Sequence, residues 1–165
     1  MKRLPILLTA AAMLVLVAAA ARAQISPPPN TKLPPVPIDE IKKIAGSLRG
    51  NYRQLMKLRP TPAQIAQIAV TPDDAAKITA YVEKLFASVS EEGLIPSSPD
   101  QTDVIVNLDL PGGYNRIKGR LKPDVRIYGF KYVAPGQSIG MAYDGLIKVG
   151  DDWILIPKLW RAFSE

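Results

Sequence analysis

The sequence predicts a single α+β domain in which helices from the first half of the chain pack on a curved antiparallel sheet from the second half. Two patterns indicate this fold class. Apolar residues recur with a helical period between residues 38 and 92, and they alternate with polar residues, as in strands, at 102–110 and again beyond residue 125. A chain of 165 residues can bury one such core. We therefore expect residues 38–165 to form one domain.

The first 23 residues have the features of a cleavable secretory signal peptide. Lys2 and Arg3 give a positive start, residues 6–20 form an apolar run, and Ala21–Ala23 contains a small-residue cleavage site. The apolar run is about 15 residues long, whereas a membrane-spanning helix needs roughly 20. We expect cleavage after Ala23, a periplasmic or secreted protein, and no stable membrane span after cleavage.

Export would leave a mildly basic protein. Cleavage removes three of the 21 lysines and arginines and none of the 15 acidic residues, so the formal charge falls from +6 to +3. For an exported protein with so small a charge we expect no nucleic-acid partner. The sequence leaves the oligomeric state open.

The chain contains no cysteine and no histidine. This composition excludes disulfides, thiol nucleophiles, Ser-His-Asp triads and metal sites made of thiolates or imidazoles. No phosphate-binding loop, dinucleotide fingerprint or calcium loop is present, and we expect no cofactor. An enzyme would depend on groups such as Asp109 and Asp144, which interrupt apolar or aromatic strand segments.

Residues 24–37 are predicted to form an extended linker. They contain Pro27–Pro29 and Leu33–Pro37, and proline disfavours helix both at its own position and at the residue before it.

Residues 38–58 have the apolar spacing of one amphipathic helix, with a kink expected near Gly46 and Gly50, each of which weakens a helix by ~1 kcal/mol relative to alanine. When residues 38–58 are projected as a helix, their cations gather on the side opposite the apolar residues. They are Lys42, Arg49, Arg53 and Lys57. This side could bind an anionic partner or envelope surface, together with the cations of residues 116–122, or it could simply be solvated.

Two Thr-Pro pairs predict the starts of further helices. Thr61 and Thr71 are N-cap residues, each followed by proline at the first helical position, and Gln64 completes a capping box. The first of these helices is expected at 61–70. The second is expected at 72–92, with Gly93 as its stop.

Four strands are predicted, at residues 102–110, 125–133, 139–149 and 153–156. Between the first two, Tyr114–Lys122 is predicted to be a short helix ending at Pro123. The alternative is a strand with four cations on one face.

The Gly150-Asp151 pair predicts a hairpin between the last two strands. A two-residue loop would pair Val149 with Asp152, whereas a three-residue loop would pair Val149 with Trp153.

The second half of the chain is rich in aromatic residues that could line a ligand pocket. The candidate ligand-binding residues are Arg126, Tyr128, Phe130, Tyr132, Tyr143 and Trp153. The first four share one strand face, so the rings could surround a small apolar ligand with the arginine at the rim. The alternative is that these rings form the core beneath the helices.

Gly150, Asp151, Trp153 and Leu155 form a G-D-x-W-x-L hairpin that resembles the end of the NTF2-like cone fold. That resemblance implies helices covering a sheet whose concave face makes a pocket. It implies no catalytic residues, because both enzymes and inert domains use the fold.

The sequence thus predicts an exported, non-catalytic domain that binds a small ligand or an envelope partner. The second expectation is a structural or interaction domain that contacts anionic envelope surfaces through the basic helix face. A carboxylate-based enzyme is the third.

Overall fold

The structure, a computed structural model, describes residues 35–89 and 98–164. The chain divides into two units, Met1–Pro35 and Val36–Glu165, and nearly all described residues belong to the second. The predicted signal peptide, nearly all of the predicted linker and the expected helix stop at Gly93 lie outside the described residues.

The prediction of one helix over residues 38–58 is wrong. The structure has α1 at Ile38–Leu48 and α2 at Tyr52–Lys57. Gly50 separates them with a φ of +59°, a left-handed conformation that ends a helix and favours glycine. Asn51 then caps α2 by accepting a hydrogen bond from the Gln54 backbone N–H.

The two Thr-Pro starts are confirmed. Helix α3 spans Pro62–Ile68, with the full capping box of Thr61 and Gln64, and α4 spans Pro72–Ala87, with Thr71 as its N-cap. Helix α4 ends five residues before the predicted position. Ser88 stops it by donating both its backbone N–H and its hydroxyl to the Leu85 carbonyl.

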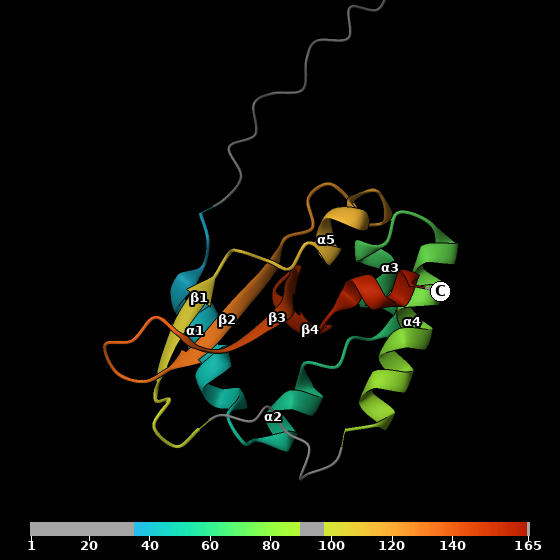
Figure 1. Cartoon of the computed structure of the whole chain (residues 1–165). Coiled ribbons are helices and arrows are strands. Elements are labelled where there is room, and N and C mark those ends of the chain that lie inside the picture. Colours follow the sequence, from blue (N-terminus) through green and yellow to red (C-terminus); the bar gives the residue numbers. More distant parts are fainter. Residues whose placement is uncertain (1–34, 90–97, 165) are drawn as a thin grey trace, which may run out of the picture. The chain divides into compact units, whose positions relative to one another are not determined.

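The α+β fold class is confirmed, because the helices pack with a four-stranded antiparallel sheet of order β1-β2-β3-β4. The sheet is curved and open, with β1 and β4 at its edges (Figure 1). The strands are β1 at Asp103–Asn107, β2 at Ile127–Val133, β3 at Gly140–Val149 and β4 at Asp152–Leu155. The first strand ends earlier than predicted, where the Asn107 side chain donates to the Asp109 carbonyl and turns the chain.

Between β1 and β2, the predicted helix forms rather than the alternative strand. It consists of α5 at Gly113–Arg116 and a 3₁₀ turn, η1, at Lys118–Arg120. A second 3₁₀ segment, η2 at Leu159–Phe163, follows β4, and the sequence analysis did not predict it.

The β3–β4 hairpin adopts the two-residue loop, because Val149 pairs with Asp152. Gly150 has a φ of +60°, as the turn requires. Strand β3 also contains a β-bulge that no local pattern indicated, at Asp144–Gly145. There the register shifts, because Tyr128 pairs with Leu146 but Phe130 pairs with Tyr143.

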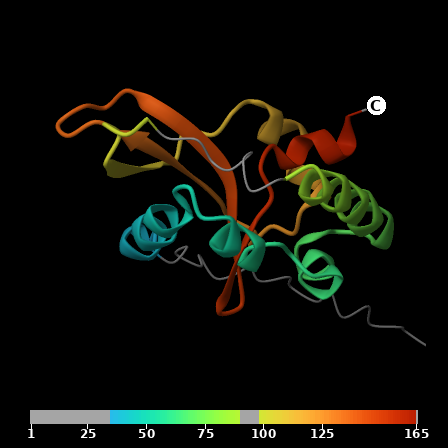
Figure 2. The ribbon, with the colours of Figure 1, turned by 90° about the horizontal axis from the view of Figure 1, so that it is seen from below.

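Helices cover both sides of the sheet. Helix α1 lies on the side that carries Tyr132, whose hydroxyl donates to the Ala45 carbonyl at 2.6 Å. Ile147 and Ile154 pair on the opposite side and are fully buried, at the end of the sheet where α3, α4 and η2 pack. Figure 2 shows α1 and α4 on opposite sides of the β3–β4 hairpin.

Within the described residues, no helix combines the length and apolar character needed to cross a membrane.

Candidate functional site

A mainly apolar hollow lies where α5 and η1 meet the start of β2. We call it the α5 hollow. Its volume is about 370 Å³. It is lined by Leu110, Tyr114, Lys118, Leu121, Lys122, Pro123, Val125 and Ile127. Its walls are mainly aliphatic, and two lysines supply its charges, so it combines an apolar interior with a cationic rim.

Backbone hydrogen bonds to the end of α3 hold the outer wall of the α5 hollow in place. Leu121 forms an isolated antiparallel bridge with Ala69. Around it, the Lys122 N–H donates to the Ile68 carbonyl at 2.9 Å, and the Val70 N–H donates to the Arg120 carbonyl at 3.0 Å. These bonds fix the segment after η1, and therefore the hollow exists without a ligand to organise it.

Tyr114 forms the inner wall of the α5 hollow and is held by Asp144. The buried phenol donates a 2.6 Å hydrogen bond to Oδ1 of Asp144, and its ring packs edge-on against Trp160 at 4.7 Å between centroids. The same oxygen accepts the Lys158 backbone N–H at 2.8 Å. Burial, and then the neighbouring Asp144 carboxylate, raise the pKa of Tyr114 far above its ordinary value, so the hydroxyl stays a donor.

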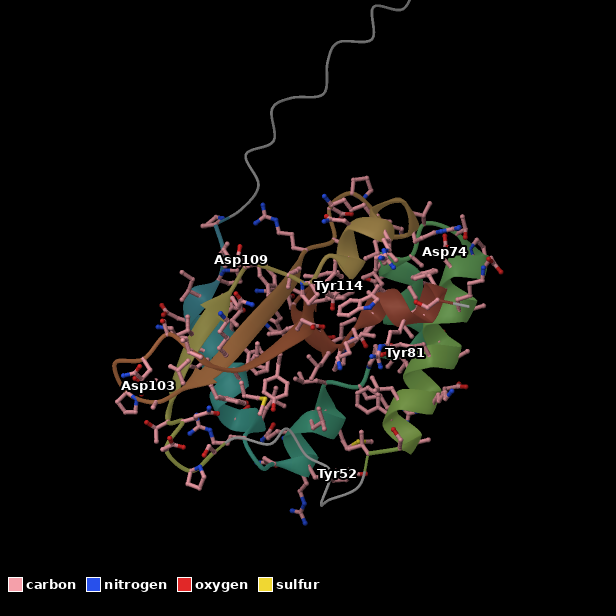
Figure 3. The ribbon with its side chains drawn as sticks, viewed as in Figure 1. Tyr52, Asp74, Tyr81, Asp103, Asp109 and Tyr114 are labelled. Atoms are coloured by element: carbon pink, nitrogen blue, oxygen red, sulfur yellow. The ribbon has the colours of Figure 1, made fainter. Side chains whose placement is uncertain are left out.

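Tyr81 supports η2 from the other side. Figure 3 shows Tyr114 and Tyr81 on two sides of the η2 segment. The Tyr81 hydroxyl donates to the Pro157 carbonyl at 2.8 Å, and burial raises its pKa. The Asp144 carboxylate of the β3 bulge thus holds both the wall of the hollow and Lys158, the residue before η2, while α4 reaches the same segment through Tyr81.

The cations of residues 116–122 have separate roles. Arg120 forms an ion pair at 3.4 Å with Asp74, which is 1% exposed. Lys122 donates to the Ala66 carbonyl at 3.2 Å and keeps two further N–H donors. Lys118 is exposed, and its amine has no hydrogen bond or ion pair with the described residues. Of the two lysines that line the hollow, Lys118 is therefore the more available to a ligand.

Three of the predicted ligand-binding residues lie in the core. Tyr128, Phe130 and Tyr132 are 6%, 0% and 0% exposed, and burial raises the pKa of Tyr132 to about 12. Phe130 packs on both Tyr132 and Tyr143 with ring centroids 5.5 Å apart. Arg126 is half-buried at the start of β2.

Trp153 lies beside Tyr128, with ring centroids 5.7 Å apart. Its indole N–H donates to Glu40 of α1 at 3.0 Å, and Lys148 donates to the same carboxylate oxygen at 2.9 Å. These two hydrogen bonds lower the pKa of Glu40. Helix α1 thus covers the aromatic face of the sheet. None of the six predicted ligand-binding residues lines the α5 hollow.

The predicted basic helix face is not one continuous surface. Arg49 is half-buried: its guanidinium lies 4.8 Å from the centre of the Tyr132 ring and donates to the Thr102 carbonyl at 3.1 Å. Lys42, Arg53 and Lys57 are exposed, but the break at Gly50 separates the first of them from the other two. Helix α2 and helix α5 also lie at opposite ends of the unit, so their cations do not form one patch (Figure 1).

The two predicted carboxylates lie in different surroundings. Asp109 is exposed just after β1 (Figure 3). Asp144 serves as the acceptor for Tyr114 and Lys158. The described residues also contain no group of three or more carboxylates that could hold a metal ion.

Two further hollows are lined by a larger share of polar groups. One, of about 330 Å³, lies between α2, α3 and α4 and includes Arg59 and Glu83. The other, of about 570 Å³, lies along β1 and includes Lys42 and Asp103. Neither contains a predicted aromatic residue.

The α5 hollow is not evident from the sequence. Its one local signal was the run of cations from Arg116 to Lys122, interleaved with Ile117 and Leu121. The hollow itself depends on bringing Leu110 and Ile127 against that run, which the sequence pattern does not specify.

Comparison with protein-family models, with curated proteins and with solved structures finds no match to this chain.

Proposed function

We propose that this protein is an exported, non-catalytic domain that binds a small, mainly apolar ligand in the α5 hollow. The periplasmic or secreted location rests on the signal-peptide pattern of residues 1–23. The binding role rests on one observation: an open hollow of about 370 Å³ has aliphatic walls and a fixed frame. Ligand pockets of proteins typically begin at roughly 300 Å³ and are mostly apolar.

The proposal moves the ligand site from the aromatic face to α5. The rings of Tyr128, Phe130 and Tyr132 are used in packing, whereas the hollow leaves apolar side chains open to solvent. The resemblance of the Gly150–Leu155 hairpin to the NTF2-like fold remains a proposal as well. It is supported by the arrangement of helices on a curved antiparallel sheet.

The proposal is tested with N-phenylnaphthylamine, a neutral probe whose fluorescence rises in apolar surroundings. Its 17 non-hydrogen atoms at ~0.3 kcal/mol each correspond to a dissociation constant on the order of 0.1 mM. Val125→Trp fills the hollow and should weaken binding by about ten-fold or more. Leu110→Trp should fill the hollow and weaken probe binding in the same way, from another lining residue.

Ile139→Trp is the matched control, because Ile139 is 87% exposed in the β2–β3 connection and does not line the hollow. Native mass spectrometry of protein purified from the exporting host should show co-purified small molecules that both filling variants lose. Equal probe binding by the wild type, Val125→Trp and Leu110→Trp, each folded by circular dichroism, would remove the proposal.

A surface-binding role remains the second proposal. Arg53 and Lys57 are exposed one turn apart on α2, and neither has an ion pair with the described residues. They could contact an anionic envelope surface. Sedimentation with vesicles containing phosphatidylglycerol tests this: Arg53→Glu with Lys57→Glu should abolish retention, and unchanged retention argues against it. A carboxylate-based enzyme comes third, since Asp109 is exposed and Asp144 is occupied as an acceptor for Tyr114 and Lys158.

A further inference from the structure

We infer that the α5 hollow selects an amphipathic anion: a compact apolar body carrying one carboxylate, sulfonate or phosphate group, which Lys118 and Lys122 bind. This inference rests on the proposed function and specifies the ligand class of the same site. The aliphatic walls would hold the body, and the two ammonium groups at the rim would hold the charge.

The side chains lining the hollow carry positive charge only. Lys118 and Lys122 are its charged members, and no aspartate or glutamate lines it. Lys118 has no hydrogen bond or ion pair with the described residues, and Lys122 uses one of its three donors on the Ala66 carbonyl. A ligand anion would therefore find free donors, without first having to displace a carboxylate.

The acidic groups around the hollow are directed elsewhere. Asp74 is buried in its ion pair with Arg120. Asp144 lies behind the Tyr114 ring, where the phenol and the Lys158 N–H both donate to it. These contacts occupy the two carboxylates, so neither is paired with Lys118 or Lys122.

Two exposed aspartates, Asp109 and Asp124, are sequence neighbours of lining residues but do not line the hollow themselves. Residues 109–126 contain these two aspartates and five cations, so the segment carries an excess of positive charge. The cations are Arg116, Lys118, Arg120, Lys122 and Arg126. This excess favours the approach of an anion over that of a cation or a neutral molecule.

The size of the hollow limits the apolar body. Its volume of about 370 Å³ is at the small end of ligand pockets, which range from roughly 300 to 1,000 Å³. One short alkyl chain, or an aromatic body of two or three rings, matches this space, whereas a two-chain lipid would leave most of its apolar surface in water.

The test compares two probes that differ in one charged group. N-phenylnaphthylamine is neutral, and anilinonaphthalene sulfonate has the same ring system with a sulfonate added. The full mature chain should bind the sulfonate more tightly than the neutral probe. The screening length is already ~10 Å at 0.1 M salt. Raising the salt concentration well above that should therefore weaken binding of the sulfonate probe and leave binding of the neutral probe unchanged.

Lys118→Ala should weaken binding of the sulfonate by about five-fold, which is ~1 kcal/mol for one exposed charge pair. The double variant with Lys122→Ala should lose more. Neither change should affect the neutral probe. Lys57→Ala is the matched control, since that lysine is exposed on α2 at the other end of the unit.

Competition identifies the head group. Octanoate and octyl phosphate should both displace the sulfonate probe, while octanol, with the same chain and no charge, should displace it poorly. The stronger of the two anions then shows whether a carboxylate or a phosphate is preferred.

The outcomes separate this inference from the proposed function. If both probes bind equally, and Lys118→Ala changes neither, the anion preference is refuted while the apolar site stands. If Val125→Trp and Leu110→Trp leave both probes bound, the site itself is wrong. If Lys57→Ala weakens binding of the sulfonate probe as much as Lys118→Ala does, the effect comes from the overall charge of the protein, and the inference also fails.

Discussion

The hydrogen bond between Tyr114 and Asp144 should contribute measurably to stability, and Tyr114→Phe isolates it. The variant keeps the ring, and with it the edge-on contact with Trp160, but loses the 2.6 Å hydrogen bond to Asp144. Hydrogen bonds to charged groups contribute about 1.5–3 kcal/mol. Asp144 would keep its bond from the Lys158 N–H and is only half-buried, so we expect a loss of about 2 kcal/mol.

Urea unfolding followed by tryptophan fluorescence measures this change, and Trp160 is a local reporter because it touches Tyr114. With a denaturant slope of about 2 kcal/mol/M, the midpoint should fall by about 1 M at an unchanged slope. A double-mutant cycle with Asp144→Asn should give a coupling energy of about 1–2 kcal/mol. An unchanged midpoint for Tyr114→Phe, or a coupling energy near zero, would refute the role given to this bond.

The raised pKa of Tyr114 adds a pH dependence with a definite sign. The folded state holds the phenolic proton more tightly than the unfolded state, so the resulting stability is present below the ordinary pKa of about 10. It is lost as the pH rises above that value, because the unfolded state then ionises first. The wild type should therefore lose stability above pH 10 more steeply than Tyr114→Phe does.

Three further predictions concern the frame of the domain. Gly145→Ala should lower the free energy of unfolding in urea by at least about 2 kcal/mol, because φ is +91° and the new Cβ would collide with the Ile156 carbonyl. Gly46→Ala is the control and should cause no such loss, because a Cβ there meets no other atom. Tyr132→Phe should cost about 1 kcal/mol through the bond to Ala45, and no loss would contradict that bond. Glu40→Gln should lower the melting temperature at pH 7. The difference should shrink as the pH falls below the ordinary glutamate pKa of about 4.3, and should vanish once the pH is below the lowered pKa of the folded state, where the wild-type carboxylate is protonated.

Features set by neighbouring residues could be predicted from the sequence. The Thr-Pro pairs at Thr61 and Thr71 mark helix starts because the cap and the first helical residues are adjacent. The hairpin at Gly150 follows in the same way from the residues of its own turn, although its register required the structure. The alternation of apolar residues likewise indicated the strands of the sheet.

Features set by distant contacts could not be predicted. The bulge at Gly145 depends on Ile156, whose N–H donates to the Gly145 carbonyl at 2.8 Å. Arg49 appeared to belong to a solvated helix face because sequence periodicity cannot show that Thr102 and Tyr132 lie beside it. The helix break at Gly50 was underestimated as a kink, since apolar spacing continues across it.

The candidate site illustrates the same limit. Aromatic residues at strand spacing fit both a pocket and a core, and only the position of α1 over Tyr132 and Trp153 distinguishes the two. The α5 hollow requires Leu121 to meet Ala69, a contact between segments about fifty residues apart.

The most direct test of the account is an amide ¹H–¹⁵N spectrum of the mature protein titrated with octanoate. We predict that the shifts concentrate on residues 110–127, around the α5 hollow, and that Val125→Trp abolishes them. Saturable shifts centred instead on Tyr128, Tyr132 and the facing residues of α1 would return the ligand site to the aromatic face and contradict the account.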